Sequence, residues 1–157
     1  MSELQKTEHI LAMRSKIQKL EEDLLSAAND KSIVAGDNNG LGNKLAPLEH
    51  TFADGVYVRQ MYMPKDTAVV GKIHKRKHVW FLLQGCISVA TEDKTEEYEA
   101  PCYVVSPGGS KRVILALEDT IFINIHPNPS NTQDLIELEK YNVAKDYEEY
   151  EQYIKKQ

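Results

Sequence analysis

The chain has 157 residues with a formal net charge of -5 at pH 7, and 41% of its residues are hydrophobic. This length and composition suffice for one compact domain with appendages, and no second domain is required. The acidic balance argues against a general nucleic-acid-binding protein, which would need a dominant basic surface. The sequence lacks an apolar run of the roughly 20 residues that span a membrane, and it lacks a signal-peptide hydrophobic region. We therefore expect a cytoplasmic protein that does not interact with membranes.

Residues 1–28 are predicted to form an amphipathic helix, because they are rich in Leu, Glu, Lys and Gln and contain neither Pro nor Gly. Two interpretations of its apolar stripe stay open. The stripe packs against the protein's own domain, or it forms a short parallel coiled coil that makes the protein a homo-oligomer. The heptad positions are Ile10, Ile17 and Leu24 at a and Met13, Leu20 and Ala27 at d.

Residues 29–48 are predicted to be a linker, because their glycines and asparagines disfavour regular structure. From residue 49 onward, short runs of Val, Ile, Tyr, Phe and Thr alternate with turn residues, as is typical of successive antiparallel strands. Many short strands without intervening helices favour a sandwich or a barrel, of which a jelly roll fits best. Strands are expected at 55–63, 68–74, 78–84, 87–91, 96–100, 103–106, 112–116 and 120–126.

Residues 129–157 are predicted to form an acidic helical tail, because the strand pattern ends at two prolines. The tail carries four tyrosines, a residue type that is enriched at protein interfaces. A tail of this kind more often packs on its own domain than binds a ligand, and we expect the same here. The tyrosines are Tyr141, Tyr147, Tyr150 and Tyr153.

The segment 71–85 contains two histidines followed by an apolar strand that Gly85 closes. It resembles the first motif of the cupin family, which reads H-x-H, three or four residues, Glu, six residues and Gly. With Gly85 as the anchor, His78 falls at the position of the glutamate and His74 at that of the second histidine. Lys72 falls at the position of the first histidine. Only part of the metal cage that the family pattern implies is therefore present.

The segment 107–112 resembles the second cupin motif, P-x-G-x-x-H, and places Arg112 at the last metal-binding histidine. The resemblance covers about half of the chain. The run from about Phe52 to His126 is similar to small cupin-like proteins of tailed bacteriophages. The resemblance implies an all-β jelly-roll (cupin) barrel over 49–128, with an N-terminal helix and a helical C-terminal tail. For a phage protein, the compartment would be the cytoplasm of the host cell. A jelly roll hosts many unrelated functions, so the resemblance predicts fold better than activity.

One chemistry predicted for this region is metal binding. Neutral imidazoles are good ligands for a divalent transition metal, and a catalytic site commonly uses three protein ligands with one open position. His74 and His78 supply two ligands, and His126 or the carboxylate of Glu118 would supply a third. The protein would then be a metal-dependent enzyme with a basic residue that orients the substrate.

A second chemistry is the binding of a small anionic or nucleotide-like ligand without turnover. Arg offers a planar fork for carboxylate or phosphate, Lys a compact charge, and aromatic rings add stacking surfaces. In a phage-like protein such a ligand would be a host metabolite or signal. The candidate ligand-binding residues are Lys72, His74, His78, Lys111, Arg112, Trp80 and Tyr57.

A third interpretation is a structural role in a virion or its assembly, carried by the N-terminal helix and the tail. We favour the binding module, because protonated Lys and Arg cannot coordinate a metal. Whether there is catalysis stays open. The sequence contains no Ser-His-Asp arrangement, no nucleophile elbow and no phosphate-binding Walker loop.

Overall fold

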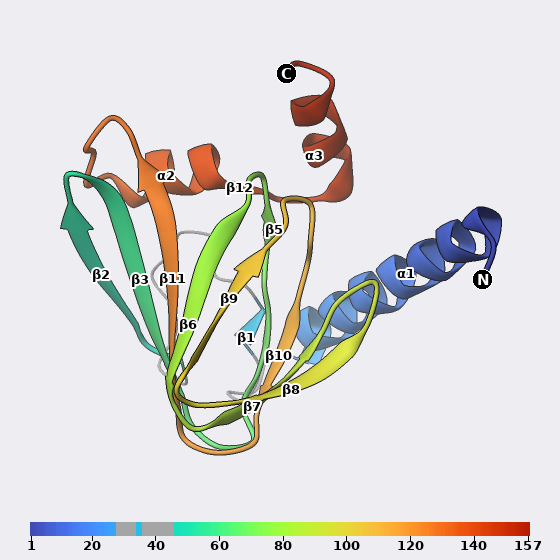
Figure 1. The fold of residues 1–157 in the computed structure, drawn as a ribbon, viewed down its shortest axis with the longest axis horizontal. Helices are drawn as coiled ribbons and strands as arrows, with labels where there is room; N and C mark the ends of the chain where they lie inside the picture. Colours follow the sequence, from blue (N-terminus) through green and yellow to red (C-terminus); the bar gives the residue numbers. More distant parts are fainter. Residues whose placement is uncertain (28–33, 36–45) are drawn as a thin grey trace.

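The computed structural model describes residues 1–27, 34–35 and 46–157. Most of the predicted linker lies outside this described part, as do the side chains of the heptad residues Leu24 and Ala27. Two five-stranded sheets face each other and form the body of the molecule (Figure 1). The first sheet has the order β1 (Val34–Ala35), β4 (Ala68–Val70), β10 (Val113–Ala116), β7 (Cys86–Ala90) and β8 (Thr95–Glu99). The second has the order β2 (Leu48–Ala53), β3 (Gly55–Met63), β11 (Thr120–Asn128), β6 (His78–Gln84) and β9 (Cys102–Ser106).

This double-sheet architecture fits the predicted jelly roll, with one correction. Within the described residues, no ladder of hydrogen bonds joins the two sheets into a closed barrel. All pairs in the two sheets are antiparallel except β1 with β4. The domain is therefore a two-layer sandwich whose inner faces meet.

Most of the predicted strands are present in the structure, but the prediction failed at Gly71 and at residues 48–53. The predicted strand 68–74 divides into β4 and a short β5 (Ile73–His74), because Gly71 leaves the ladder and donates its N–H to the carbonyl of Arg112. Sequence reasoning missed β2, which begins inside the predicted linker at Leu48 and pairs with β3.

The hydrophobic core lies between the two sheets and follows strand alternation. Inward positions at the centre of the strands hold Met61, Trp80, Phe122 and Ile114, all buried. Continuing along the same inward faces toward one end of the sandwich, the side chains become polar. That polar end holds the candidate functional site.

The backbone conformation explains why the first motif ends in a glycine at position 85. Its φ is +85°, a left-handed conformation that favours glycine. A Cβ at this position would lie 2.5 Å from the carbonyl oxygen of Asp119. The glycine therefore permits the tight passage from β6 to β7.

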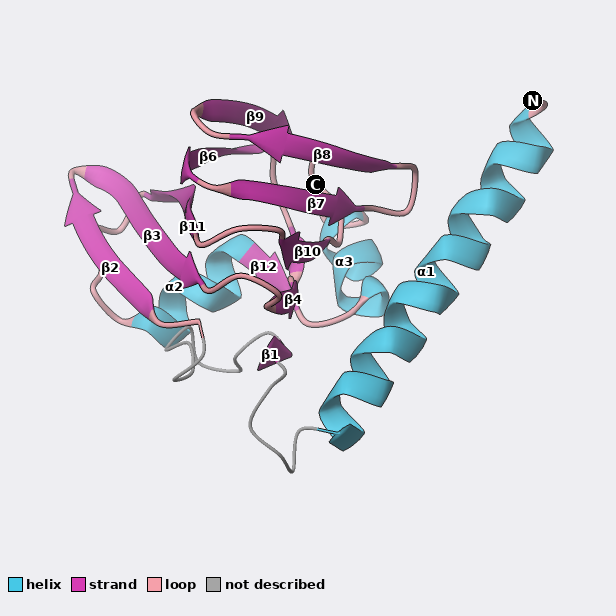
Figure 2. Cartoon of the chain, turned by 90° about the horizontal axis from the view of Figure 1, so that it is seen from below, coloured by secondary structure: helices cyan, strands magenta, loops and turns pink. Residues whose placement is uncertain are grey.

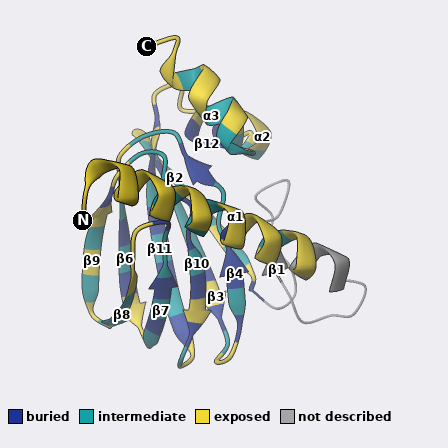
Figure 3. Ribbon diagram, turned by 90° about the vertical axis from the view of Figure 1, so that its right-hand side faces the viewer, coloured by how far each residue is buried: buried dark blue, intermediate teal, exposed yellow. Residues whose placement is uncertain are grey.

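Helix α1 (Glu3–Ala27) begins with a capping box, in which Ser2 and Gln5 exchange hydrogen bonds between side chain and backbone. The helix runs along the outer side of the first sheet (Figures 2 and 3). Ile17 is only 4% exposed, and Ile10 and Met13 are half-buried. Three of the predicted heptad residues thus pack on the protein's own domain, whereas Leu20 is exposed. A coiled coil between copies stays a prediction.

The predicted helical tail is interrupted by a strand. It consists of α2 (Leu135–Asn142), β12 (Val143–Ala144) and α3 (Tyr147–Ile154). The side chains of Asp134 and Asp146 cap the two helices. Val143 and Ala144 leave the helical conformation because they pair with β5 and satisfy its backbone. The tail therefore crosses the polar end of the sandwich (Figure 1).

Two basic residues before β6, Lys75 and Arg76, hold the tail in place. Arg76 donates to the carbonyl of Tyr141 and lies 4.1 Å from the centre of its ring. Lys75 forms an ion pair with Glu149. Lys77, by contrast, is exposed. In the described part of the chain, no helix is long and apolar enough to cross a membrane.

Candidate functional site

The site is a layer of polar side chains at the end of the sandwich under α2. Strand register brings its members together, because Tyr57 on β3 lies opposite His126 on β11. On β6, His78 follows Trp80 on the inward face, and His74 comes from β5. The three histidine rings stack, with centroid separations of 3.7 Å for His74 and His78, 5.2 Å for His74 and His126, and 5.8 Å for His78 and His126.

Arg112 lies against these histidines and is 5% exposed. Its Nη2 is 3.1 Å from Nε2 of His74 and 2.9 Å from Nε2 of His78. Since arginine can only donate, both imidazole Nε2 atoms must accept and carry no proton. Nδ1 of His78 then carries the proton and donates to the carbonyl of Arg76 at 3.3 Å. One guanidinium nitrogen therefore bridges two neutral histidines.

Burial and positive charge keep these histidines neutral. Burial first, and then the charge of Arg112, lower the pKa of His78 to about 3. The same two causes in the same order hold the pKa of His74 well below its ordinary value, and burial followed by the charge of Arg59 does so for His126. Burial also lowers the pKa of Arg112 to about 10, so the guanidinium stays charged at neutral pH.

A metal ion does not fit this arrangement. The Nε2 atoms of His74 and His78 both point at Nη2 of Arg112, so the guanidinium occupies the point at which the two imidazoles would hold a metal ion. Both Nε2 atoms already accept from Arg112, at distances longer than the roughly 2.0–2.1 Å of a zinc–nitrogen bond. A cation would also meet the charges of Arg112 and Arg59. Within the described residues, no group of three or more His, Cys, Asp and Glu has the arrangement of a metal site.

The described residues provide no carboxylate that neutralises the positive charge of Arg112. Its Nη1 is buried without a hydrogen bond, and among the described residues it forms no ion pair with a carboxylate. Two other polar atoms in this layer, Nδ1 of His74 and Oδ1 of Asn124, are also buried without partners. Unpaired buried polar groups are rare in folded proteins, and each requires an explanation. The layer therefore has unused capacity for hydrogen bonds around a buried cation.

Arg112 also lines a pocket of about 260 Å³ that opens between β6, β7, β8 and β9. Aromatic side chains of Trp80 and Tyr98 contribute to its walls, and Ser106 and Ser110 contribute hydroxyl groups. Three acidic side chains also line the pocket, those of Glu92, Asp93 and Glu96, and other residues engage two of them. Glu96 pairs with Lys94 and accepts from the hydroxyl of Tyr98. Glu92 accepts from the hydroxyl of Tyr147 at 2.5 Å and from the backbone N–H of Lys111 at 3.3 Å.

The two lysines among the predicted site residues are engaged elsewhere. Lys72 forms an ion pair with Glu139 of α2. Lys111 forms one with Glu21 of α1, because neighbouring residues on an extended segment point to opposite sides and Arg112 points inward. Of the basic residues predicted to line one cationic pocket, the structure brings Arg112 alone against His74 and His78.

The two predicted aromatic residues have structural partners. Trp80 is buried among Tyr98 and Phe122, with its ring at 87° to that of Tyr98. It also lines the Arg112 pocket. Tyr57 stacks on His126, and its hydroxyl lies 2.7 Å from Nδ1 of His50.

Sequence reasoning missed several members of the polar layer. His50, Arg59 and Asn124 were not among the predicted site residues. Strand alternation could have found Arg59 and Asn124, since both lie two positions from a core residue on the inward face, Arg59 before Met61 and Asn124 after Phe122. The proposed third ligand His126 does join His74 and His78, whereas Glu118 lies beyond the opposite end of β11, before Thr120.

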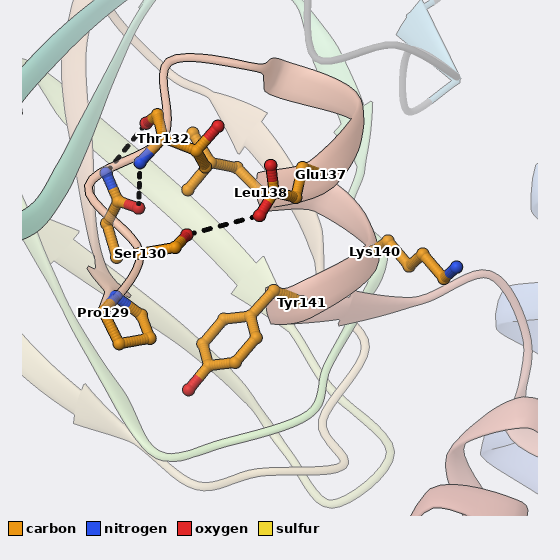
Figure 4. A pocket seen from close by; sticks show the side chains of 8 residues that line it. Pro129, Ser130, Thr132, Glu137, Leu138, Lys140 and Tyr141 are labelled. Carbon is orange, nitrogen blue, oxygen red and sulfur yellow. Dashed lines mark hydrogen bonds between the residues drawn. The ribbon is translucent and has the colours of Figure 1, made fainter.

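A second pocket, of about 310 Å³, lies between α2 and the loop that follows β11 (Figure 4). Its polar side chains satisfy one another. Asn128 bonds the backbone of Thr132 through both its amide atoms, and the hydroxyl of Ser130 donates to Glu137 at 3.3 Å. None of the side chains around this pocket has a buried polar atom without a partner. We therefore take the Arg112 pocket as the candidate site.

Comparison with solved structures finds similar folds, and these include cupins. A cupin family protein of RmlC-like, double-stranded β-helix fold from Methanocaldococcus jannaschii is 17% identical, with 56% of this chain and 85% of that chain covered and a TM-score of 0.47. A cupin-2 domain-containing protein from Shewanella frigidimarina is 15% identical, with coverages of 51% and 80% and a TM-score of 0.43. KdgF from a Halomonas species is 12% identical, with coverages of 54% and 82% and a TM-score of 0.48.

Sequence-based comparisons add nothing to these likenesses. No protein-family model matches the chain, and no curated protein does. At TM-scores below 0.5, the structural likenesses give no information on ligand or activity. The fold description therefore rests on the strand order and register above, and the functional interpretation rests on the Arg112 site.

Proposed function

We propose that this protein is a binding module that takes a small anionic ligand at Arg112, without turnover. The observation that carries the proposal is the buried guanidinium of Arg112, which has no carboxylate counter-ion among the described residues. Burying an unpaired charge is costly, and proteins ordinarily pair such a charge or neutralise it. A carboxylate or phosphate that reaches the guanidinium would offset this cost with charge-assisted hydrogen bonds.

The neighbouring residues suit such a ligand. Two neutral histidines hold one side of the guanidinium, so its orientation is fixed before a ligand arrives. The adjacent pocket offers aromatic walls from Trp80 and Tyr98 beside hydroxyl groups, which suits a small ligand with a planar part and an acidic group. Capture of a host metabolite or nucleotide signal by a phage protein remains an expectation from the sequence resemblance.

The test is a thermal-shift and calorimetric screen with defined anions. Inorganic phosphate, citrate and adenosine monophosphate are suitable probes, added to the wild type and to Arg112→Ala and Lys77→Ala. A ligand that binds only the folded state raises the melting temperature. We expect at least one probe to stabilise the wild type and Lys77→Ala, with the effect lost in Arg112→Ala.

Lys77→Ala is the matched control, because it removes one positive charge from an exposed position near the same end of the sandwich. Equal loss of the effect in both variants would mean that the probes respond to overall charge. Equal binding by the wild type and Arg112→Ala would refute the proposal. Binding that requires added zinc and depends on His74 would instead support the metal-dependent enzyme.

A further inference from the structure

The outer face of the second sheet is apolar where water would favour polar side chains. In an antiparallel sheet with one solvated face, inward apolar residues alternate with outward polar ones. On β11 the inward residue Phe122 is flanked by outward Ile121 and Ile123, and Ile125 follows on the same outer face. Around Phe122 the strand is thus apolar on both sides, as strands covered on both faces are.

The strands beside β11 continue this face. On β6, the outward residues are Val79, Phe81 and Leu83, and Leu83 is 52% exposed. On β9, Tyr103 and Val105 are 67% and 54% exposed. Phe81 and Tyr103 pair across the two strands, with ring centroids 5.6 Å apart.

The strands β3, β11, β6 and β9 carry no charge on this face, and the charged outward residue Glu49 lies on the edge strand β2. The outward positions of β3, β11, β6 and β9 hold no Asp, Glu, Lys or Arg. On β3, Tyr62 adds another partly exposed ring to the apolar side chains, and Gln60 adds a neutral amide. Depletion of charge and enrichment in aromatic side chains characterise the centres of protein interfaces, and large apolar patches on a monomer mark interaction sites.

No described element of this chain covers the face. Helix α1 lies along the other sheet, and α2 and α3 lie at the polar end of the strands (Figures 1 and 2). The residues outside the described part, 28–33 and 36–45, contain only three large apolar residues, Ile33, Leu41 and Leu45. Three such side chains are too few to cover outward apolar positions on four strands.

A second copy of the chain matches the face in area and in chemistry. With strands about 4.8 Å apart and outward side chains about 6.7 Å apart along each strand, the outer face of the four strands β3, β11, β6 and β9 covers roughly 400 Å² in projection. The accessible surface of protruding side chains is larger than their projection, which brings the face near the roughly 800 Å² per partner of a standard interface. The uncharged part of the face, on β3, β11, β6 and β9, meets no charge repulsion when it packs on itself about a two-fold axis with Glu49 of β2 at the edge.

We propose that this outer face is the interface of a symmetric homodimer, with β11 and β6 of both copies at its centre. The two sheets would pack face to face at about 10 Å, as sheets do within sandwich domains. Each copy would keep its polar end and the Arg112 pocket outside the interface. Helix α1 would remain on its own domain.

The mass of the full-length protein in solution tests the dimer, by light scattering after size exclusion and by sedimentation from about 1 to 100 μM. The disrupting variant is Leu83→Glu with Tyr103→Glu, which introduces charge at two exposed outward positions. The matched control is Leu4→Glu with Leu11→Glu on α1, where the leucines are 69% and 56% exposed. Circular dichroism and thermal melting establish that each variant folds.

We expect a dimer for the wild type and for the α1 control, and dimerisation weakened at least about 100-fold in the sheet variant, since buried interface residues commonly carry the binding energy. If the double variant does not fold, Val105→Lys on the edge strand is the second test, with the same expected loss. A wild type that is monomeric at 100 μM would overturn the proposal. So would a dimer that survives the sheet variants, or one that only the α1 variant disrupts, which would indicate a coiled coil.

Discussion

Arg112 combines two properties that are seldom found in one side chain, burial and an unneutralised positive charge. Its Nη2 donates to two imidazole acceptors, whereas its Nη1 is buried without a hydrogen-bond partner among the described residues. The resemblance to the second cupin motif implies a metal-binding histidine at this position, whereas this chain has an arginine. A guanidinium cannot coordinate a metal but can pair with a carboxylate or phosphate, which is the basis of the proposed anion site.

The buried histidines make the stability of the protein depend on pH. Their folded-state pKa values lie below the ordinary value of about 6.5. Just below that pH, these histidines are therefore protonated in the unfolded chain but stay neutral in the folded chain. The free energy of unfolding should therefore fall from pH 6.5 downward, and for His78 the loss continues to about pH 3. At pH 5 each such histidine costs about 2 kcal/mol.

Urea unfolding at pH 7.5 and pH 5.0 measures this dependence above the range in which most carboxylates titrate. Relative to the wild type, His78→Gln should lose about 2 kcal/mol of the difference between the two pH values. His9→Gln is the control, because that side chain is exposed on α1 in the folded chain as it is in the unfolded one. An identical pH dependence in the wild type and His78→Gln would contradict the buried, neutral state of His78.

At the scale of elements, the C-terminal tail crosses the polar end of the sandwich and packs against it. Its strand β12 pairs with β5, which carries His74, and its helix α2 packs over Tyr57, Arg59 and His126 around a small cavity. Leu138 of α2 is buried at this contact. The tail therefore closes this end of the polar layer, while the Arg112 pocket opens on another side.

Arg76 should control how firmly the tail is held. Replacing it with Ala removes a hydrogen bond to the carbonyl of Tyr141 and cation–π contacts with two tyrosine rings, each contact contributing about 0.5–1 kcal/mol. We expect amide hydrogen exchange in α2 and α3 to become about tenfold faster in Arg76→Ala, with little change in the two sheets.

Lys77→Ala is the matched control for the tail, because Lys77 is the exposed neighbour in the same loop. Its exchange pattern should equal that of the wild type. Uniformly faster exchange over the whole domain in Arg76→Ala would show that Arg76 stabilises the sandwich and not the tail alone. Unchanged exchange in α2 and α3 would show that the basic loop does not hold the tail.

At the scale of the whole molecule, alternation in the sequence predicted most strands and the two-sheet class of the fold. The strands β3 and β6 have the bounds that the pattern of apolar residues predicted. The failures arose where pairing partners lie far apart in sequence. Residues Val143 and Ala144 have no local reason to be extended, and only their pairing with β5 explains β12.

The site was predictable in its histidines and not in its basic residues. His78 and His126 meet because β6 and β11 are paired neighbours, and His74 joins them from β5, as residue spacing favoured for His74 and His78. The partners of Lys72 and Lys111 come from α2 and α1, about 70 and 90 positions away in the sequence. A sequence pattern cannot show such ion pairs, and it therefore grouped these lysines with Arg112.

The measurement that tests the central claim most directly is elemental analysis of untagged protein after dialysis against excess zinc and then against buffer without chelator. The wild type is compared with the His74→Ala/His78→Ala double variant. Because Arg112 occupies both imidazole Nε2 atoms, we predict that the wild type retains no stoichiometric metal and does not differ from the variant. About one zinc ion per chain in the wild type, lost in the double variant, would contradict the account and make this a metal site.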